Sequence, residues 1–126
     1  MQQRHCSRDS PLTNTYGNQI PMPAGFGLRA LASVGSTNDE ARMLANQGIS
    51  DGTVVWALEQ TLGRGRQGKG WTSPPGNLYA SVVLRDVGPM ENAAQLSFVT
   101  ALAMNDAVSD FAKHPDKITL KWPNDL

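Results

Sequence analysis

The stretch Gly63-Arg64-Gly65-Arg66-Gln67-Gly68-Lys69-Gly70-Trp71 sets the first constraint on this chain of 126 residues. It holds four glycines, three cations and one aromatic side chain. Glycine lets backbone N–H groups approach an anion closely, and arginine donates charge-assisted hydrogen bonds to phosphate oxygens. The stretch therefore predicts a loop that binds the phosphates of a nucleotide or another polyanion.

Two familiar nucleotide-binding motifs overlap this loop, but the residues that follow argue against both. The first three glycines have the spacing of the dinucleotide-binding fingerprint, and the loop also matches most of a P-loop. Each motif needs a helix directly afterwards, and Pro74-Pro75-Gly76 cannot open one. Gly70 also stands where a P-loop carries the Ser or Thr that reaches Mg²⁺.

A second segment, near the other end of the chain, favours a nucleotide site over a plain Gly/Arg surface loop. Ile118-Thr119-Leu120 alternates as a strand does, and Lys121-Trp122-Pro123-Asn124-Asp125-Leu126 follows it. Proline ends the strand, so we expect Asn124 and Asp125 at a strand terminus, where they can meet a metal-bound triphosphate. An isolated Pro-Asn-Asp also fits a plain turn.

Together with Ser36-Thr37-Asn38 and Gln60, these two segments resemble the catalytic domain of biotin protein ligases, also called biotin acetyl-CoA-carboxylase ligases. The resemblance extends over residues 26–126, with the motifs in order and at fitting separations. It implies an α/β fold with a mixed sheet and packed helices, related to the catalytic cores of class II aminoacyl-tRNA synthetases.

The resemblance implies an ATP-dependent ligase that works in two steps. The biotin carboxylate attacks the α-phosphate of ATP to form biotinyl-5′-AMP, and a lysine of the biotin carboxyl carrier domain of a carboxylase then displaces AMP. The first step brings two anions together, so Mg²⁺ and positioned cations must offset their repulsion. The implied ligands are ATP, biotin and Mg²⁺.

The match also implies roles for individual residues. The residues expected to bind biotin or nucleotide are Ser36, Thr37, Asn38, Gln60, Gly63, Arg64, Gly65, Arg66, Trp71 and Asn124. The residues expected to be catalytic are Arg64, Arg66, Lys121 and Asp125, with Lys69 as a further loop cation. Arg66 is the strongest candidate for holding biotin and the adenylate, and Asn124 and Asp125 are the expected Mg²⁺ ligands.

Several of these residues have a structural explanation as well. Thr37, with Glu40 three residues later, fits a capping box at the start of a helix. Gln60 also fits a solvated edge position, Trp71 a hydrophobic anchor that closes the loop, and Lys121 an exposed salt bridge.

Hydrophobic periodicity predicts an α/β layer arrangement. The expected elements are strands over residues 28–34, 53–58, 77–84 and 118–120, a helix over 36–48 and a long helix over 91–112. The strand over 53–58 is a nearly continuous apolar run, so we expect burial on both of its faces and antiparallel pairing with the strand after the loop. The long helix is expected to pack on the sheet.

Composition indicates how the chain divides into segments, which partners it has and in which compartment it works. Residues 1–25 are rich in polar residues and predict a disordered leader without a helix-turn-helix, whereas 26–126 form the N-terminal part of the catalytic domain. Because biotin ligases continue beyond the Lys-Trp-Pro-Asn-Asp motif, we expect a fragment of low activity. Eleven basic and eleven acidic residues cancel, so neither nucleic acid nor a membrane is expected as a partner. The single cysteine, Cys6, fits the reducing cytoplasm.

Two alternatives stay open on the sequence alone. Lipoate ligases share the fold, although they usually carry paired arginines before the glycines, which this chain lacks. A nucleic-acid-binding module would instead use the Arg/Gly loop on single strands, with steeply salt-dependent binding.

Overall fold

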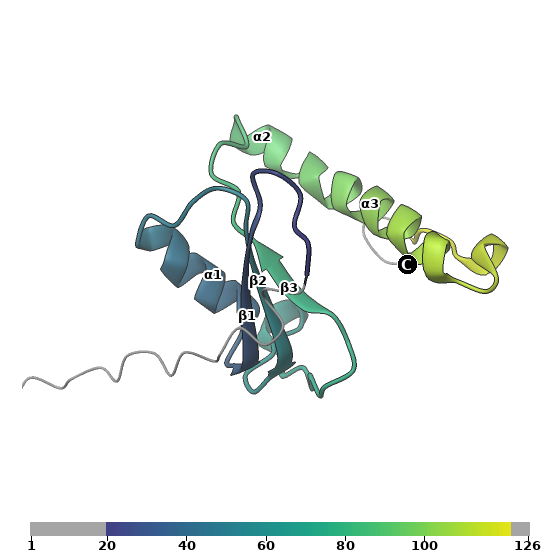
Figure 1. The fold of residues 1–126 in the computed structure, drawn as a ribbon, viewed down its shortest axis with the longest axis horizontal. Coiled ribbons are helices and arrows are strands. Elements are labelled where there is room, and N and C mark those ends of the chain that lie inside the picture. Colours follow the sequence, from purple (N-terminus) through teal and green to yellow (C-terminus); the bar gives the residue numbers. More distant parts are fainter. Residues whose placement is uncertain (1–19, 122–126) are drawn as a thin grey trace, which may run out of the picture. The chain divides into compact units, whose positions relative to one another are not determined.

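The computed structural model describes residues 20–121, and the chain divides into two compact units, Met1–Arg85 and Asp86–Leu126 (Figure 1). The elements of the first unit are β1 (Gly27–Val34), α1 (Thr37–Asn46), β2 (Thr53–Gln60), a 3₁₀ turn (Arg66–Gly68) and β3 (Tyr79–Val82). Those of the second unit are α2 (Met90–Ala93), α3 (Gln95–Phe111) and a 3₁₀ turn (Pro115–Lys117).

The three strands form one mixed sheet with β2 in the centre. β1 runs parallel to β2, with Val34 opposite Gln60, and β3 runs antiparallel to β2, with Ser81 opposite Val55. The mixed sheet and the antiparallel pairing of the strand after the loop are thus confirmed. β3 is shorter than the expected strand over 77–84.

The core of the first unit lies between α1 and one face of the sheet. Ala41 and Leu44 of α1 are buried together with Val55 and Val83. Alternate residues of β2 differ in burial, because Val55 is fully buried whereas Trp56 is only half-buried. α1 covers only one face of β2, and the residues of the other face are half-buried within the described part of the chain. Burial of β2 on both faces therefore stays a prediction.

Arg85, just after β3, ties the end of α1 to the sheet. Its guanidinium donates to the carbonyl oxygens of Ala45, at 2.7 Å, and Ile49, at 2.8 Å. Its backbone N–H donates to Asp51 Oδ1 at 2.8 Å. A cation at a helix C-terminus satisfies carbonyl groups that have no partner within the helix, so this end of α1 is fixed.

The second unit is helical, as expected, although the long helix over 91–112 is divided into α2 and α3 by a turn at Ala94. The structure describes this unit by itself, so packing of α3 on the sheet stays a prediction. Within residues 20–121, no helix combines the length and apolar content that crossing a bilayer requires.

The expected strand over 118–120 is not formed. Ile118, Thr119 and Leu120 carry no strand assignment. A β-strand is defined by a ladder of hydrogen bonds to a neighbour, and alternation in the sequence supplies only the side-chain pattern. Among the described residues, the three strands of the sheet all belong to the first unit.

Val55 provides a test of where the core lies. Val55→Ala removes two buried carbon atoms and leaves a cavity beneath α1, so we expect the free energy of unfolding to fall by about 2 kcal/mol. Val82→Ala on β3 is the matched control, because Val82 is 47% exposed. Urea unfolding followed by far-UV circular dichroism measures both; equal losses would contradict this core.

Candidate ligand-binding site

Parallel pairing of β1 and β2 brings two of the predicted site segments to one edge of the sheet. Val34 and Gln60 lie opposite each other at the ends of their strands. Beyond them, Thr61 N–H donates to the carbonyl of Val34 and Leu62 N–H donates to that of Gly35, at 2.9 and 2.8 Å. The chain after β1 enters α1, and the chain after β2 enters the glycine loop, so both start from this edge.

Gln60 joins the start of α1 to the end of β2. Its Oε1 accepts hydrogen bonds from Thr37 N–H at 2.8 Å and from Thr37 Oγ1 at 3.1 Å. Its Nε2 donates to the Oγ of Ser73, a buried residue, at 3.2 Å. A carbonyl oxygen has two lone pairs, so Thr37 satisfies this acceptor fully and leaves one N–H of the amide for another group.

The predicted capping box is wrong. The N-cap residue is Ser36 rather than Thr37, and its side chain makes no capping bond. Glu40 accepts a hydrogen bond from Arg29 Nε at 3.1 Å instead of reaching back to the cap. The first N–H of α1 finds its acceptor in Gln60, from another strand, so a local capping side chain is unnecessary.

Ser81 and Ser73 were missed by reasoning from sequence. Ser81 Oγ lies 2.9 Å from both Thr37 Oγ1 and Asn38 Oδ1, and so extends the Thr37–Gln60 contact to β3. The strand alternation carries a signal for Ser81, because it shares a face with the buried Val83. No local pattern indicates Ser73.

Residues 63–71 form a β-hairpin, called the glycine hairpin below. Arg64 and Gly70 form an antiparallel bridge, Gly65 N–H donates to Lys69 O at 2.7 Å, and Trp71 N–H donates to Gly63 O at 2.8 Å. The tip turns at Gln67, which has a φ of 58°. No helix follows the hairpin before β3, as the Pro-Pro-Gly run predicts, and both helix-dependent phosphate motifs are therefore absent there.

Gly63 is required by packing inside the hairpin. A Cβ at this position would lie 2.5 Å from both Ser73 Oγ and the carbonyl oxygen of Trp71. Trp71 packs over Gly65 in turn, because a Cβ there would lie 3.4 Å from Trp71 Cε3, yet the tryptophan stays 64% exposed. The glycines thus serve close approach between the two hairpin strands.

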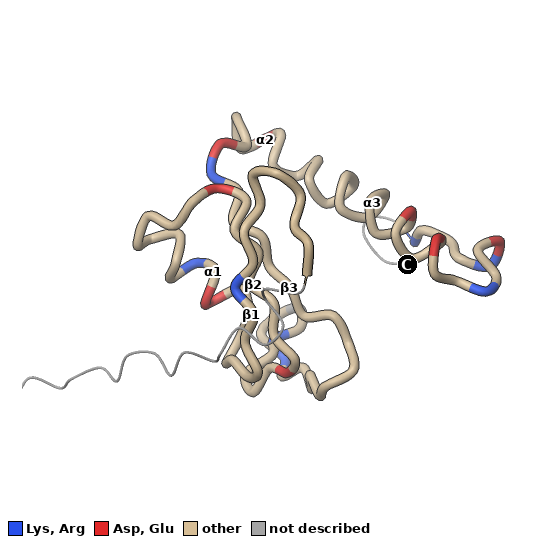
Figure 2. The backbone as a smooth tube through the Cα atoms, viewed as in Figure 1, with Lys and Arg blue, Asp and Glu red and all other residues tan. Residues whose placement is uncertain are grey.

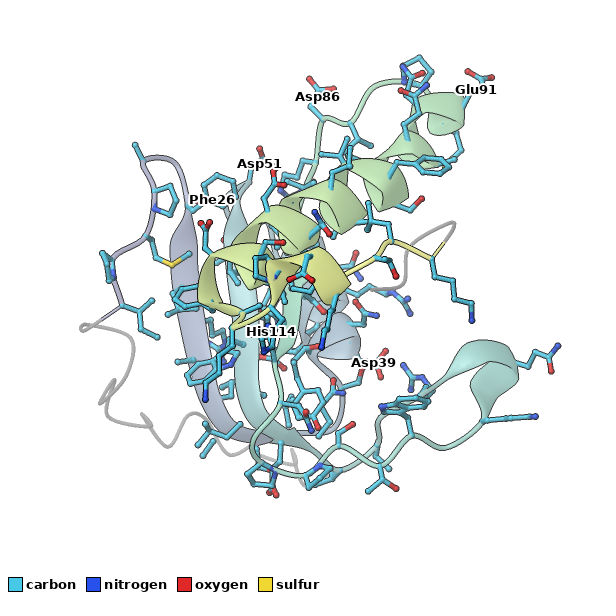
Figure 3. The ribbon with its side chains drawn as sticks, turned by 90° about the vertical axis from the view of Figure 1, so that its right-hand side faces the viewer. Phe26, Asp39, Asp51, Asp86, Glu91 and His114 are labelled. Carbon is cyan, nitrogen blue, oxygen red and sulfur yellow. The ribbon has the colours of Figure 1, made fainter. Side chains whose placement is uncertain are left out.

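Arg64 is paired with a carboxylate at the start of α1. Its Nη2 lies 2.5 Å from Asp39 Oδ1, and both side chains are about half exposed. Figure 3 labels Asp39, beside the glycine hairpin. The hydrogen bond and the charge of Arg64 lower the pKa of the Asp39 carboxyl, and the same bond raises that of the guanidinium.

An open hollow of about 770 Å³ lies beside the hairpin, lined by residues 59–64 and 70–74. Its lining includes four predicted site residues: Gln60, Gly63, Arg64 and Trp71. This volume is within the range of small-molecule sites. Ser36, Thr37 and Asn38 do not line it, but Thr37 contacts Gln60, which does.

The placement of Arg66, Asn124 and Asp125 at this site stays a prediction. The structure does not describe the side chain of Arg66, and Asn124 and Asp125 lie outside the described residues. Lys121 is exposed and belongs to the second unit. Within residues 20–121, no group of three or more His, Cys, Asp or Glu side chains is arranged to hold a metal ion. Figure 2 shows basic and acidic positions interspersed along the described chain.

Gly63→Ala tests the packing of the hairpin. The added methyl meets Ser73 and the backbone of Trp71, so we expect the two hairpin strands to separate. Amide hydrogen exchange at Trp71 should then speed up at least about tenfold, as it does when a protecting hydrogen bond opens. Gly70→Ala, where a Cβ meets nothing within 4 Å, should leave this rate unchanged; similar rates in both variants would refute the packing argument.

The Asp39–Arg64 pair predicts a pH dependence. Because the pKa of Asp39 is lowered in the folded chain, the pair stabilises the fold above the unfolded-state pKa, and this contribution disappears as pH falls through the lowered value. Carboxyl titration by NMR should show Asp39 below the usual range of aspartate, and Arg64→Gln should return it toward that range. An unchanged value in the variant would mean that the pair is absent in solution.

The sequence model of the family described as "Biotin/lipoate A/B protein ligase family" matches residues 31–126. Over 96 residues the chain is 47% identical to the biotin--[acetyl-CoA-carboxylase] ligase of Paracoccus denitrificans, a match that covers 76% of this chain and 40% of that protein. The chain thus spans about two fifths of the length of this relative.

Solved structures give the same result. The biotin protein ligase of Leishmania major in complex with biotinyl-5-AMP matches with a TM-score of 0.67 and 31% identity, over 82% of this chain and 47% of that chain. That of Aquifex aeolicus in complex with biotin and ATP matches with a TM-score of 0.64 and 39% identity, over 78% of this chain and 40% of that chain. The expected α/β fold is confirmed as part of the core of these enzymes. Because the family's sequence model covers most of its residues, the chain belongs to the biotin/lipoate A/B protein ligase family.

Proposed function

We propose that this chain is the ligand-binding part of a biotin protein ligase, which activates biotin with ATP and transfers it to a lysine of a carboxylase carrier domain. The observation that carries the proposal is the contact of Gln60 with Thr37, because it joins two of the motif segments beside the hollow. The related ligases of known structure hold biotin, ATP or biotinyl-AMP, which supports biotin and ATP as its substrates.

The hairpin supplies positive charge where the two anionic substrates meet. Arg64 lines the hollow, and Arg66 and Lys69 lie at or next to the hairpin tip. Charge-assisted hydrogen bonds from these side chains offset the repulsion between the biotin carboxylate and the α-phosphate. They also stabilise the negative charge that develops on the phosphoryl oxygens during attack.

Trp71 and Gln60 recognise the uncharged parts of the substrates. The indole of Trp71 is 64% exposed and lines the hollow, so its π-face is available to stack on adenine. Gln60 keeps one amide N–H that no described residue uses, since its carbonyl is saturated by Thr37 and its other N–H binds Ser73. That N–H is a donor suited to a carbonyl oxygen of biotin.

Asn124 and Asp125 are the proposed Mg²⁺ ligands. Their amide and carboxylate oxygens are the donors that this hard cation prefers. When bound, Mg²⁺ neutralises phosphate charge and activates the α-phosphate toward attack. Asp125 is also proposed to orient the incoming lysine, and Lys121 to pair with phosphate.

The proposed partner is the biotin carboxyl carrier domain of a carboxylase, and the proposed setting is the cytoplasm. The formal charge of the chain is zero, and no block of basic residues extends over the described part (Figure 2). We therefore propose no nucleic-acid or membrane partner for these residues.

Ligand-dependent stability tests the proposal directly. We expect biotin, ATP and Mg²⁺ together to raise the melting midpoint, because a ligand that binds only the folded chain stabilises it by mass action. Lipoate with ATP and Mg²⁺ should not, and mass spectrometry should detect biotinyl-AMP. A rise of the melting midpoint with lipoate, ATP and Mg²⁺ but not with biotin, ATP and Mg²⁺ would favour the lipoate ligases. Steeply salt-dependent binding of single-stranded DNA, with no rise of the midpoint in either mixture, would favour the nucleic-acid module.

Arg66→Ala tests the assignment of the main cation. Loss of a charge-assisted hydrogen bond costs about 1.5 to 3 kcal/mol, so the affinity for biotinyl-5′-AMP should fall about 10- to 100-fold. Arg29→Ala, which removes one positive charge on β1 from a residue that does not line the hollow, is the control and should bind as the unaltered chain does. Isothermal titration calorimetry measures both; equal affinities of the two variants would contradict the role of Arg66.

A further inference from the structure

One ion pair connects the glycine hairpin to α1. Asp39 lies in the first turn of α1, and its Oδ1 accepts a hydrogen bond from Arg64 Nη2 at 2.5 Å. Among the hairpin side chains that the structure describes, Arg64 is the one that forms an ion pair. Arg42, one turn along α1, lies 4.0 Å from the same carboxylate oxygen and contributes charge rather than a hydrogen bond.

The pair leaves most of the donors of Arg64 available. A guanidinium carries five N–H groups in a rigid plane, and within the described residues Arg64 donates only through Nη2 to Asp39. The Arg64 side chain is 49% exposed and lines the hollow. One edge of the guanidinium is thus held by protein, and the others can donate to an anion in the hollow.

We propose that Asp39 is a positioning residue of this site, which holds the Arg64 guanidinium beside the hollow so that its remaining N–H groups meet an anionic group of the ligand. The inference rests on the proposed function, since it assumes an acyl-adenylate, whose phosphate carries a negative charge. An unrestrained arginine loses side-chain entropy when a ligand fixes it in one orientation. With Asp39 in place, folding has already fixed that side chain.

A simple charge argument makes the opposite prediction. Asp39 is an anion close to the hollow, so removing its charge should strengthen the binding of an anionic ligand if orientation were unimportant. If Asp39 positions Arg64, removing its charge weakens the binding of the anionic ligand; if Asp39 only repels the ligand, removing its charge strengthens that binding. Asp39→Asn decides between them, because asparagine has nearly the same shape and no charge.

The experiment measures the dissociation constant of biotinyl-5′-AMP by isothermal titration calorimetry for the full chain. We expect Asp39→Asn to weaken binding about tenfold, which corresponds to one charge-assisted contact that is no longer aligned. Asp39→Glu should restore most of the affinity. Glu40→Gln is the matched control, because Glu40 is the neighbouring carboxylate in the same turn and binds a different arginine, Arg29.

A double-variant cycle separates positioning from a general effect on structure. If Asp39 acts through Arg64, Asp39→Asn should weaken binding no further once Arg64→Gln is present. Additive losses, or unchanged or tighter binding by Asp39→Asn, would overturn the inference. Failure of the unaltered chain to bind biotinyl-5′-AMP would instead overturn the proposed function, and the inference with it. Melting midpoints of all variants verify that each is folded.

Discussion

The parallel pairing of β1 with β2 is the constraint on which the site depends. Two parallel neighbours end at the same edge of a sheet, so the segments that follow them begin side by side. Here the register places Val34 opposite Gln60, and the chain continues into α1 from one strand and into the glycine hairpin from the other. The hydrogen bonds that Thr37 donates to Gln60 and Arg64 donates to Asp39 both form across this edge.

The hairpin combines a closely paired backbone with cationic and aromatic side chains. Its backbone is paired along both sides, from the Gln60–Ser73 bridge to the contact between Gly65 and Lys69. At the same time it carries three cations and an exposed tryptophan. Glycine reconciles the two, because the strands approach at Gly63 more closely than any side chain permits. A paired backbone can present charged side chains in fixed directions.

Motifs in the sequence predicted several site segments, and three of these lie at one edge of the sheet, but the motifs did not predict how they contact one another. The glycine loop, Gln60 and Ser36-Thr37-Asn38 all reach the same edge of the sheet. That Arg64 pairs with Asp39, 25 residues away, depends on tertiary structure and leaves no local pattern. The capping box failed for the same reason, since an acceptor from β2 took the place of a local side chain.

The hydrogen bonds that fix the Gln60 amide have a consequence for ligand binding at this edge of the sheet. An amide can usually turn over by 180° and exchange its donor and acceptor ends, but the backbone N–H of Thr37 can only donate and therefore requires the Oε1 end of Gln60. The chain therefore selects a single rotamer before any encounter. If Gln60 binds a ligand as proposed, the direction of its donor is set before binding, and association requires no reordering of that side chain. Gln60 would then select ligands by their shape and by the direction of their acceptor group, and the pairing of β1 with β2 sets that direction.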